Sequence, residues 1–271
     1  SNDELSALNR TQFNSLKEML WGGAWVDGHP AGVQIFLYYW VKVFGNSEAV
    51  IRFPFVLCGI LSVFFAYKAA SLWFSKGAGI FVAIVTGFLE FPLLYSNIAR
   101  PYSPGLMFVM LQAWYWKKIL TETEINTKQK ILNSVIFCTS ITGAIYTHYF
   151  AGLMSIIIGL TGLFYINKKN YIFYIFSYII AVLLFLPHLP FTLNHLSIGG
   201  IEEWLTKPDK FWFFKHIFNF FNKDFVLLFF IIAISILAYI INPQTKKLNS
   251  LRIVALIWAI LPFIIAYIYS Y

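Results

Sequence analysis

Long apolar segments alternate with short polar turns along most of the chain. A helix needs about 20 apolar residues to cross the hydrocarbon core of a bilayer, and eight segments approach this length. The pattern predicts transmembrane helices at Ala49–Leu72, Ala78–Asn97, Pro104–Leu120, Ile131–Thr147, Tyr149–Ile166, Tyr171–Phe191, Phe225–Ile241 and Leu251–Tyr271. The fold class that follows is an all-α polytopic membrane protein with about eight spans.

Two places in this pattern need a finer interpretation. The fourth and fifth spans are separated only by the turn around His148. Together they are too long for one span, so we predict a tight helical hairpin. The apolar segment Ala31–Phe44 is too short to cross and contains Gln34 and Lys42. This composition predicts a helix that lies along the membrane interface.

The domain organisation follows from these elements. We expect a first outer loop at 1–48 that holds interfacial helices, and a transmembrane helical domain at 49–271 with a second outer loop at 192–224. The chain begins outside the membrane with no visible signal peptide or preceding span, and it ends in an apolar segment. We therefore expect a fragment that lacks a first span and a C-terminal region.

The composition excludes other classes of protein. The chain is 59% hydrophobic and only 12% charged, about half the charged fraction of a soluble domain. Disorder requires low hydrophobicity and high charge, and the two cysteines, Cys58 and Cys138, both lie in apolar runs rather than in a disulfide pattern. The net charge of +8 comes from short basic clusters between apolar segments, so it indicates membrane topology and no nucleic-acid partner.

The basic clusters also predict the sidedness of the chain. They occupy alternate turns, which the positive-inside rule assigns to the cytoplasm: Lys68 with Lys76, Lys117 with Lys118, Lys128 with Lys130, Lys168 with Lys169, and Lys246 with Lys247 and Arg252. All five histidines and most of the acids fall on or near the opposite face. A transporter needs polar groups near the midplane, so this asymmetry favours an enzyme that works at the outer interface.

Two candidate sites lie in the first outer loop. Asp3 and Glu4 are adjacent carboxylates at the membrane surface, placed to act as a base; the alternative is a helix cap with a favourable dipole interaction. A Gly-rich loop ends in Asp27-Gly-His29-Pro30. We expect Pro30 to begin the interfacial helix, which leaves His29 at a helix N-terminus where anions are favoured. The alternative for His29 is an ordinary loop histidine.

Further candidates lie at the outer ends of the spans. Arg100, in the turn Ala99-Arg100-Pro101-Tyr102, has the geometry to clamp a phosphate, although a snorkelling arginine is the alternative. His148 at the hairpin tip either contributes to a site or hydrogen-bonds a loose carbonyl. Arg52 is expected to be an anchor. Chemistry alone does not rank the remaining polar residues on this face: His188, His195, Glu202 and Glu203.

Several motifs are absent from the sequence. There is no P-loop, no GxGxxG and no Asp-x-Asp, so nothing marks a nucleotide or a metal-bound nucleotide sugar. There is also no HExxH and no GxSxG, which argues against a zinc protease and an α/β-hydrolase.

The order of the motifs resembles a known family. Asp3-Glu4 is followed by His29-Pro30, then Phe-Gly-Asn-Ser-Glu-Ala-Val-Ile-Arg52, Tyr-Ser-Asn-Ile-Ala-Arg100-Pro-Tyr102, Tyr-Thr-His148-Tyr-Phe and Leu-Pro-His-Leu-Pro190. This series is similar to the GT-C class of membrane glycosyltransferases, specifically to bacterial relatives of the dolichyl-phosphate-mannose protein mannosyltransferases (glycosyltransferase family 39). One departure is His-Pro-Ala31, where relatives commonly have His-Pro-Pro.

The resemblance implies roles for these residues. An aspartate of the first outer loop activates the acceptor in such families, and Asp3 matches it, with Glu4 beside it. His29, Arg100 and Tyr102 match elements that hold the lipid phosphate, and we assign His148 to the same site. No cofactor is established, but some members use a divalent metal, for which His29 and His148 are the candidate ligands.

The implied reaction moves a hexose or pentose from a polyprenyl-phosphate donor to an acceptor on the outer face, with inversion. The acceptor class is open between a protein, lipid A and another glycan of the cell envelope. The implied location is the bacterial inner membrane, among its lipids, with the site facing the periplasm. Two alternatives stay open, a lipid-linked sugar flippase or transporter, and a structural subunit of an envelope-assembly complex.

Overall fold

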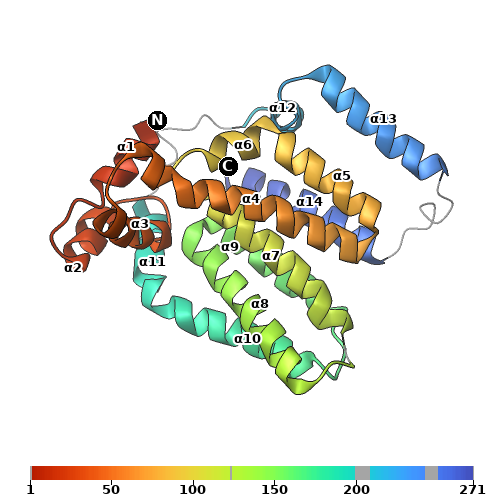
Figure 1. Cartoon of the computed structure of the whole chain (residues 1–271), viewed down its shortest axis with the longest axis horizontal. Coiled ribbons are helices and arrows are strands. Elements are labelled where there is room, and N and C mark those ends of the chain that lie inside the picture. Colours follow the sequence, from red (N-terminus) through yellow and green to blue (C-terminus); the bar gives the residue numbers. More distant parts are fainter. Residues whose placement is uncertain (1, 123, 199–207, 242–249, 271) are drawn as a thin grey trace. The chain divides into compact units, whose positions relative to one another are not determined.

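The structure is a computed structural model that describes residues 2–122, 124–198, 208–241 and 250–270. Within these ranges every regular element is a helix and none is a strand (Figure 1). The predicted all-α class is therefore confirmed. The chain divides into two compact units: the first is Ser1–Gly87 with Pro92–Gly200, and the second is Phe88–Phe91 with Ile201–Tyr271. The expected first outer loop, 1–48, belongs to the same compact unit as the helices that follow it.

Each of the eight predicted apolar segments contains at least one helix. The helices of the first unit are α1 (Asn2–Asn9), α2 (Leu16–Glu18), the π-helix η1 (Met19–Ala24), α3 (Gly32–Phe44), α4 (Glu48–Trp73), α5 (Lys76–Phe88), α6 (Glu90–Ser96), α7 (Tyr102–Thr121), α8 (Thr127–Thr147), α9 (Tyr149–Leu163), α10 (Tyr171–Phe185), the 3₁₀ helix η2 (Leu186–His188) and α11 (Leu189–Ile198). Those of the second unit are α12 (Trp212–Phe220), α13 (Phe225–Ile241) and α14 (Ser250–Tyr269). The ends of α5 and α6 around Leu89 fall at the division between the units.

Fewer of the described helices pass a test for membrane spans than the eight that the sequence predicts. Three described helical stretches are long and apolar enough to cross a bilayer, Glu48–Trp73, Tyr171–Ser197 and Ser250–Tyr269, and two bent pairs, α5 with α6 and α12 with α13, raise the number to five. The prediction of eight spans is not confirmed. The reason is polarity and length: α7 and α8 are long but carry many polar side chains, and α9 is apolar but has only 15 residues.

The second predicted span is interrupted rather than continuous. Its helix breaks at Leu89, between α5 and α6. Pro92 has no backbone N–H to donate to the carbonyl of Phe88 four residues earlier, so the helical hydrogen bonding cannot run through this point. A proline already visible in the sequence explains why the span Ala78–Asn97 is bent.

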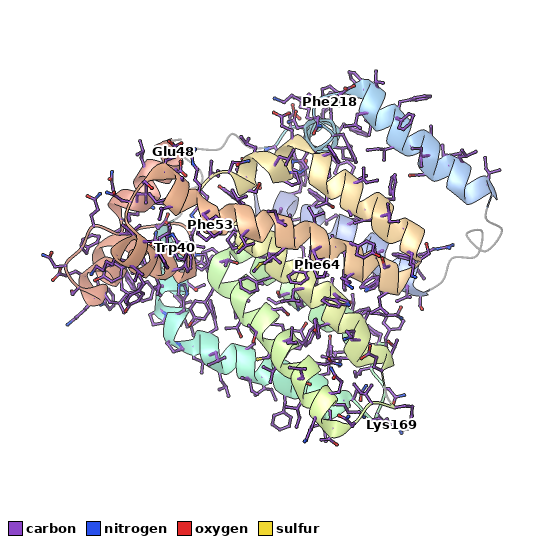
Figure 2. The ribbon with its side chains drawn as sticks, in the orientation of Figure 1. Trp40, Glu48, Phe53, Phe64, Lys169 and Phe218 are labelled. Carbon is purple, nitrogen blue, oxygen red and sulfur yellow. The ribbon has the colours of Figure 1, made fainter. Side chains whose placement is uncertain are left out.

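A second proline helps to fix α3 against α4. Pro54 lies inside α4 and leaves the carbonyl of Val50 without its helical partner. The indole Nε1 of Trp40, on α3, donates to this carbonyl at 2.8 Å; Figure 2 labels Trp40 beside α4. Together the two helices and the loop before α7 enclose one apolar cluster: Val33, Leu37, Ile51, Phe55 and Ala99.

The helices α7, α9 and α10 approach one another closely. A methyl group at Gly162 would lie 2.0 Å from Oη of Tyr174, so only glycine fits there. The fully buried Gln112 donates to Oη of Tyr178 at 2.9 Å and accepts from Oγ of Ser155 at 2.6 Å. Small residues and interhelical hydrogen bonds are how helices associate when lipid offers no hydrophobic contrast.

The outward faces of the helices are apolar. On α4, Phe53 and Phe64, which are labelled in Figure 2, have 60% and 45% of their surface exposed. The exposed face of α3 carries Phe36, Tyr39 and Val43. Exposed apolar surface of this extent on several helices is typical of a protein solvated by lipid.

The second unit has its own internal contacts. Trp212 on α12 stacks on His216 with ring centroids 5.3 Å apart and contacts Phe263 of α14. Asn222, whose φ is 61°, accepts the backbone N–H of Glu90 at 2.6 Å. Within the expected loop 192–224, α11 and α12 are helical, and the candidates Glu202 and Glu203 lie outside the described residues.

Candidate active site

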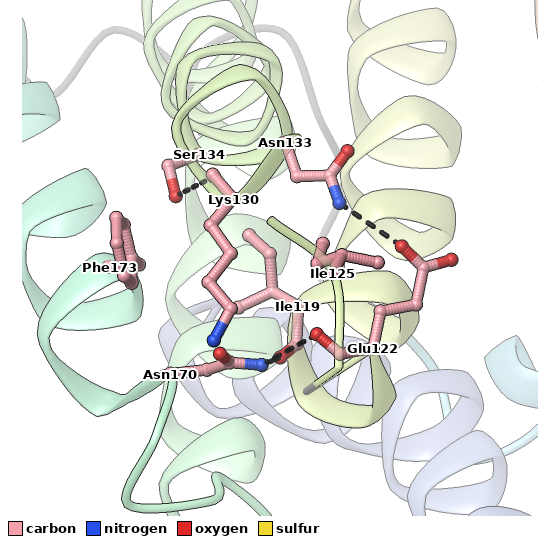
Figure 3. Close-up of a pocket in the computed structure, with 8 residues that line it drawn as sticks. All are labelled: Ile119, Glu122, Ile125, Lys130, Asn133, Ser134, Asn170 and Phe173. Carbon is pink, nitrogen blue, oxygen red and sulfur yellow. Dashed lines mark hydrogen bonds between the residues drawn. The ribbon is translucent and has the colours of Figure 1, made fainter. Parts of the chain in front are cut away.

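The turns that connect the helices of the first unit form two groups, one at each end of α7, α8 and α10. At the end predicted to be cytoplasmic, Asn133 donates to Oε2 of Glu122 at 3.2 Å, and Asn170 donates to the carbonyl of Ile119 at 2.7 Å (Figure 3). The cavity between them has a volume of about 10 Å³, which is the space of a single water molecule. This end is closed by hydrogen bonds and is too small for a sugar.

The opposite end gathers the first loop and the ends of the helices that are predicted to face outward. In Figure 1, α1, α2 and α3 lie together at the beginning of α4. The start of α7, the junction of α8 with α9, and η2 with α11 also meet this loop through the contacts described below. All described histidines of the first unit, which the sequence predicts to lie on the outer face, are found at this end. They define the candidate site.

Glu4 ties α1 to the rest of the site. Its carboxylate accepts a two-pronged bond from Arg52, with Nε at 2.9 Å from Oε1 and Nη2 at 2.7 Å from Oε2. Oε1 also accepts the backbone N–H of Ala99 at 3.1 Å. The hydrogen bond from Arg52 lowers the pKa of Glu4 and outweighs the opposing effect of burial. Glu4 therefore holds α1, α4 and the turn before Arg100 together.

Asp27 is the centre of a second set of contacts. It is 6% exposed, it forms an ion pair with Arg10, and its other oxygen accepts from the side-chain amide of Gln34. Its Oδ1 lies 3.3 Å from Nδ1 of His29. Burial raises the pKa of Asp27, but the hydrogen bond and charge of His29 and then the charge of Arg10 prevail and bring it to about 2. The carboxylate is therefore ionised and orients the ring of His29.

Three of the predicted site residues meet as rings. The centroids of His29 and His148 are 5.4 Å apart, those of His29 and Tyr102 are 6.4 Å apart, and those of Tyr102 and His148 are 5.6 Å apart. These residues come from the first loop, the start of α7 and the hairpin tip. The sequence predicts that these three residues share one site, and the structure brings their rings within contact distance of one another.

Arg100, the fourth predicted residue, borders this group of rings. It is 7% exposed, and its Nε has no hydrogen-bond partner among the residues that the structure describes. Its positive charge acts on His148 strongly enough to lower that residue's pKa. A buried guanidinium with an unmet donor is costly unless an anion completes it. A snorkelling arginine would reach water, so burial favours the clamp over that alternative.

His148 is held as a neutral ring. Its Nδ1 accepts the backbone N–H of Phe150 at 3.1 Å, which caps α9 and leaves the ring hydrogen on Nε2. Burial lowers the pKa of His148 first, and the positive charges of His29 and Arg100 lower it further, to about 4. The hairpin tip therefore combines a helix cap with a residue that senses the positive potential of the site.

Residues near η2 and α11 buttress the first loop, and sequence reasoning left them unranked. His188 accepts the backbone N–H of Ala31 through Nε2 at 3.0 Å. His195 bonds to the carbonyl of Ala24 at 2.9 Å and to Oη of Tyr149 at 2.7 Å. A methyl group at Gly32 would lie 2.4 Å from the carbonyl oxygen of Tyr146, so the backbone before α3 is also fixed by close packing.

Three sequence expectations about the site are modified. The helix α3 begins at Gly32 with Ala31 as its N-cap, so Pro30 precedes the helix instead of starting it. Arg52 is not only an anchor, because it is the partner of Glu4. The sequence shows Asp27 only as part of the loop motif, whereas in the structure it orients the ring of His29. The sequence signal for this role was an aspartate two positions before a loop histidine.

The candidate base and the candidate metal are placed only in part. The backbone of Asp3 lies in α1, next to Glu4, and its side chain is outside the part of the chain that the structure describes. For a metal, His29 and His148 are adjacent, but no group of three or more His, Cys, Asp or Glu side chains among the described residues has the geometry to hold an ion. The described side chains therefore do not by themselves form a metal site.

The fold and the site together define an integral membrane protein made of apolar helices, with a polar and positively charged site at one end of its helices. The family model described as "Dolichyl-phosphate-mannose-protein mannosyltransferase" matches residues 28–191. This match covers more than half of the chain and includes His29, Arg100, Tyr102 and His148. The chain therefore belongs to this family of GT-C glycosyltransferases.

Family membership carries a general activity. Proteins of this family are glycosyltransferases that use polyprenyl-phosphate sugars as donors and, in general, proteins as acceptors. Comparison with curated proteins and with solved structures gave no match. The sugar, the acceptor and the residues that carry the reaction are therefore matters for proposal.

Proposed function

We propose that the protein transfers a sugar from a polyprenyl-phosphate donor to an acceptor on the outer face of a bacterial inner membrane, with inversion at the anomeric carbon. The observation that carries this proposal is the convergence of His29, Tyr102 and His148 from three separate segments beside the buried Arg100. A site that faces the periplasm agrees with the basic turns at the other end of the helices.

The electrostatics support a phosphate at this site. Arg100 brings a buried positive charge with an unmet donor, and His29 is oriented by an ionised Asp27. Burial lowers the pKa of His148 first, and the positive charges of His29 and Arg100 lower it further, so part of this effect comes from a positive local potential. In glycosyl transfer the phosphate is the leaving group, so negative charge develops on it as the bond to the sugar breaks. Donors already aimed at this position stabilise that charge without reorganisation.

The carboxylates of α1 supply the other half of the reaction. Because Glu4 is fully engaged with Arg52 and Ala99, we assign it a positioning role. Asp3 is then the base that accepts the proton of the acceptor hydroxyl, as the family resemblance implies. The hydroxyl attacks the anomeric carbon on the side opposite the phosphate, and this geometry inverts the configuration. The acceptor class stays open between a protein, lipid A and another envelope glycan.

The test uses the full-length parent protein in membranes supplied with polyprenyl-phosphate sugars. Release of free polyprenyl phosphate is followed for wild type, Asp3→Asn and Arg100→Ala, with Lys118→Ala at the opposite end of α7 as a matched charge-removal control. Loss of one donor to a developing oxyanion costs about 10²–10³ in kcat, so we expect that fall for Arg100→Ala, a larger fall for Asp3→Asn and wild-type release for Lys118→Ala.

The same experiment separates the alternatives. Equal release by all variants, or no release from any donor at normal protein levels, would overturn the transferase proposal and favour a lipid-linked sugar flippase. Parallel loss in Lys118→Ala would mark the effect of Arg100→Ala as general damage to the fold. No observation in the described residues favours the flippase or a structural subunit.

A further inference from the structure

An aromatic corner lies beside the candidate site, and neither the phosphate group nor the base uses it. Trp21, Trp25 and Phe191 form this corner, with ring centroids 4.8 Å apart for the two tryptophans and 5.5 and 5.2 Å from each to Phe191. Trp21 is 52% exposed, while Trp25 and Phe191 are half-buried. The rings are tilted against one another rather than stacked flat, so they form an angled surface with one open side.

The corner is held by rare backbone structure and by polar contacts. Trp21 lies in the π-helix η1, and the N–H of Trp25 bonds to the carbonyl of Leu20 five residues back at 2.8 Å. Such π-turns occur frequently at functional sites. A methyl group at Gly23 would lie 2.5 Å from the carbonyl oxygen of Arg10, so η1 is pressed against the end of α1. Asn194 donates to the carbonyl of Trp25 at 2.9 Å and fixes the other side.

The corner is continuous with the candidate phosphate site. The ring of Phe191 stacks on His188 with centroids 5.4 Å apart. His188 in turn accepts the N–H of Ala31, two residues after His29. Trp25 is also only two residues from Asp27, which orients His29. A series of contacts and short chain connections therefore links His29 to the aromatic corner.

We propose that this aromatic corner binds the sugar ring of the polyprenyl-phosphate donor, with the face of Trp21 against the C–H groups of the ring. The inference rests on the proposed function, since it takes the phosphate to lie at His29 and Arg100. In such a donor the sugar is bonded directly to the phosphate, so its ring must lie on a surface adjoining the phosphate site. The negative face of an indole attracts the positive C–H edge of a sugar, and an indole also carries an N–H donor.

A membrane belt is the competing explanation for exposed tryptophans. Belt residues act singly and need only the interface, whereas this corner joins three rings from two distant segments. It is also flanked by Asp27, His195 and Asn194, which are polar side chains engaged in specific contacts. These neighbours favour a polar ligand with an apolar face, and a pyranose or furanose ring has that character.

The experiment compares two probes on the full-length protein in detergent: polyprenyl phosphate, and the same lipid carrying mannose or glucose. Affinities are measured by displacement of a fluorescent polyprenyl phosphate for wild type, Trp21→Ala, Trp21→Phe and the control Tyr39→Ala, an α3 residue with a similar exposure of 51%. Trp21 is exposed, so these variants are expected to fold. We expect at least one sugar-bearing probe to bind wild type more tightly than the bare phosphate.

The variants should change only the contribution of the sugar. Loss of one stacked ring costs about 1.4 kcal/mol, so Trp21→Ala should reduce the advantage of the sugar-bearing probe about tenfold. Trp21→Phe should restore most of it, and Tyr39→Ala should leave it intact. Binding of bare polyprenyl phosphate should be the same in all four proteins.

Other outcomes have distinct meanings. If Trp21→Ala still prefers the sugar-bearing probe to bare polyprenyl phosphate by the same factor as wild type, the inference is overturned. It is also overturned if Trp21→Ala and Tyr39→Ala weaken the binding of both probes equally. In either case the corner is part of a membrane belt. If wild type binds bare phosphate but gains nothing from any sugar, only the sugar corner fails. A fifth protein, Arg100→Ala, is measured with bare polyprenyl phosphate alone; if it binds this probe as well as wild type does, the phosphate site fails first, and the corner fails with it.

Discussion

Replacement of Asp27 by asparagine removes one charge from the centre of the site with almost no change in shape. In the native protein burial raises the pKa of Asp27, but His29 and Arg10 lower it from its ordinary 3.8 to about 2. A shift of nearly two units corresponds to about 2 kcal/mol of stability at neutral pH. Because the folded pKa lies below the unfolded one, this contribution is complete above about pH 4 and is lost as the pH falls through the range from 3.8 to 2.

The measurement is thermal unfolding of the full-length protein in detergent at pH 7, followed by tryptophan fluorescence. We expect Asp27→Asn to unfold at a Tm lower by several degrees, in line with about 2 kcal/mol. The matched control is Asp209→Asn, since Asp209 forms an exposed pair with Lys215. Exposed pairs contribute about 1 kcal/mol at most, so this variant should unfold close to wild type.

A second readout tests the orienting role of Asp27 directly. An asparagine cannot hold the charged form of His29 in the same way, so release of polyprenyl phosphate should fall about tenfold or more when Asp27→Asn is assayed below its Tm. Equal Tm values for Asp27→Asn and wild type would refute the buried charge network. A lowered Tm with unchanged release would show that Asp27 stabilises the loop without orienting His29.

Three further predictions concern separate parts of the first unit. The folded pKa of His148 is about 4, lowered by burial and by nearby positive charge; the unfolded chain therefore binds the extra proton first, and wild type should lose stability as the pH falls from 6.5 to 4, whereas the Tm of His148→Gln should show a smaller fall over the same range. Gly162→Ala places a methyl 2.0 Å from a neighbouring hydroxyl and should cost about 1–3 kcal/mol by overpacking; Gly77→Ala, whose methyl would meet Oγ of Ser75 at an ordinary contact distance of 3.8 Å, should be neutral or slightly stabilising in the same unfolding assay. Glu4→Gln removes the buried one of the two carboxylates that pair with Arg52 and leaves only Glu48; it should cost about 1.5–3 kcal/mol in the same unfolding assay.

The helical elements were predictable from the sequence, because long apolar runs in lipid must satisfy their backbone hydrogen bonds within helices. Every predicted segment contains a helix for this reason. The number of crossings was less predictable, since α7 and α8 mix polar and apolar side chains. The break at Leu89 was visible in principle at Pro92, but a helix can bend or break at a proline, and local sequence does not decide which.

The site divides in a similar way. Motif order pointed to His29, Arg100, Tyr102 and His148, because these residue types suit a lipid phosphate and all lie at outer ends of helices. The sequence did not show that Asp27 orients His29, although the two are close in the chain.

Other partnerships depended on packing alone. Glu4 and Arg52 are 48 positions apart, and Trp21 and Phe191 are separated by most of the described chain. A charge or a ring reveals its chemical type in the sequence, but its partner is whichever group the packed helices bring within a few ångströms. The sequence by itself determined the helices and the kinds of side chain at their ends. Only the tertiary structure decided which carboxylate is held in place, which arginine is buried with an unmet donor, and which rings form a surface.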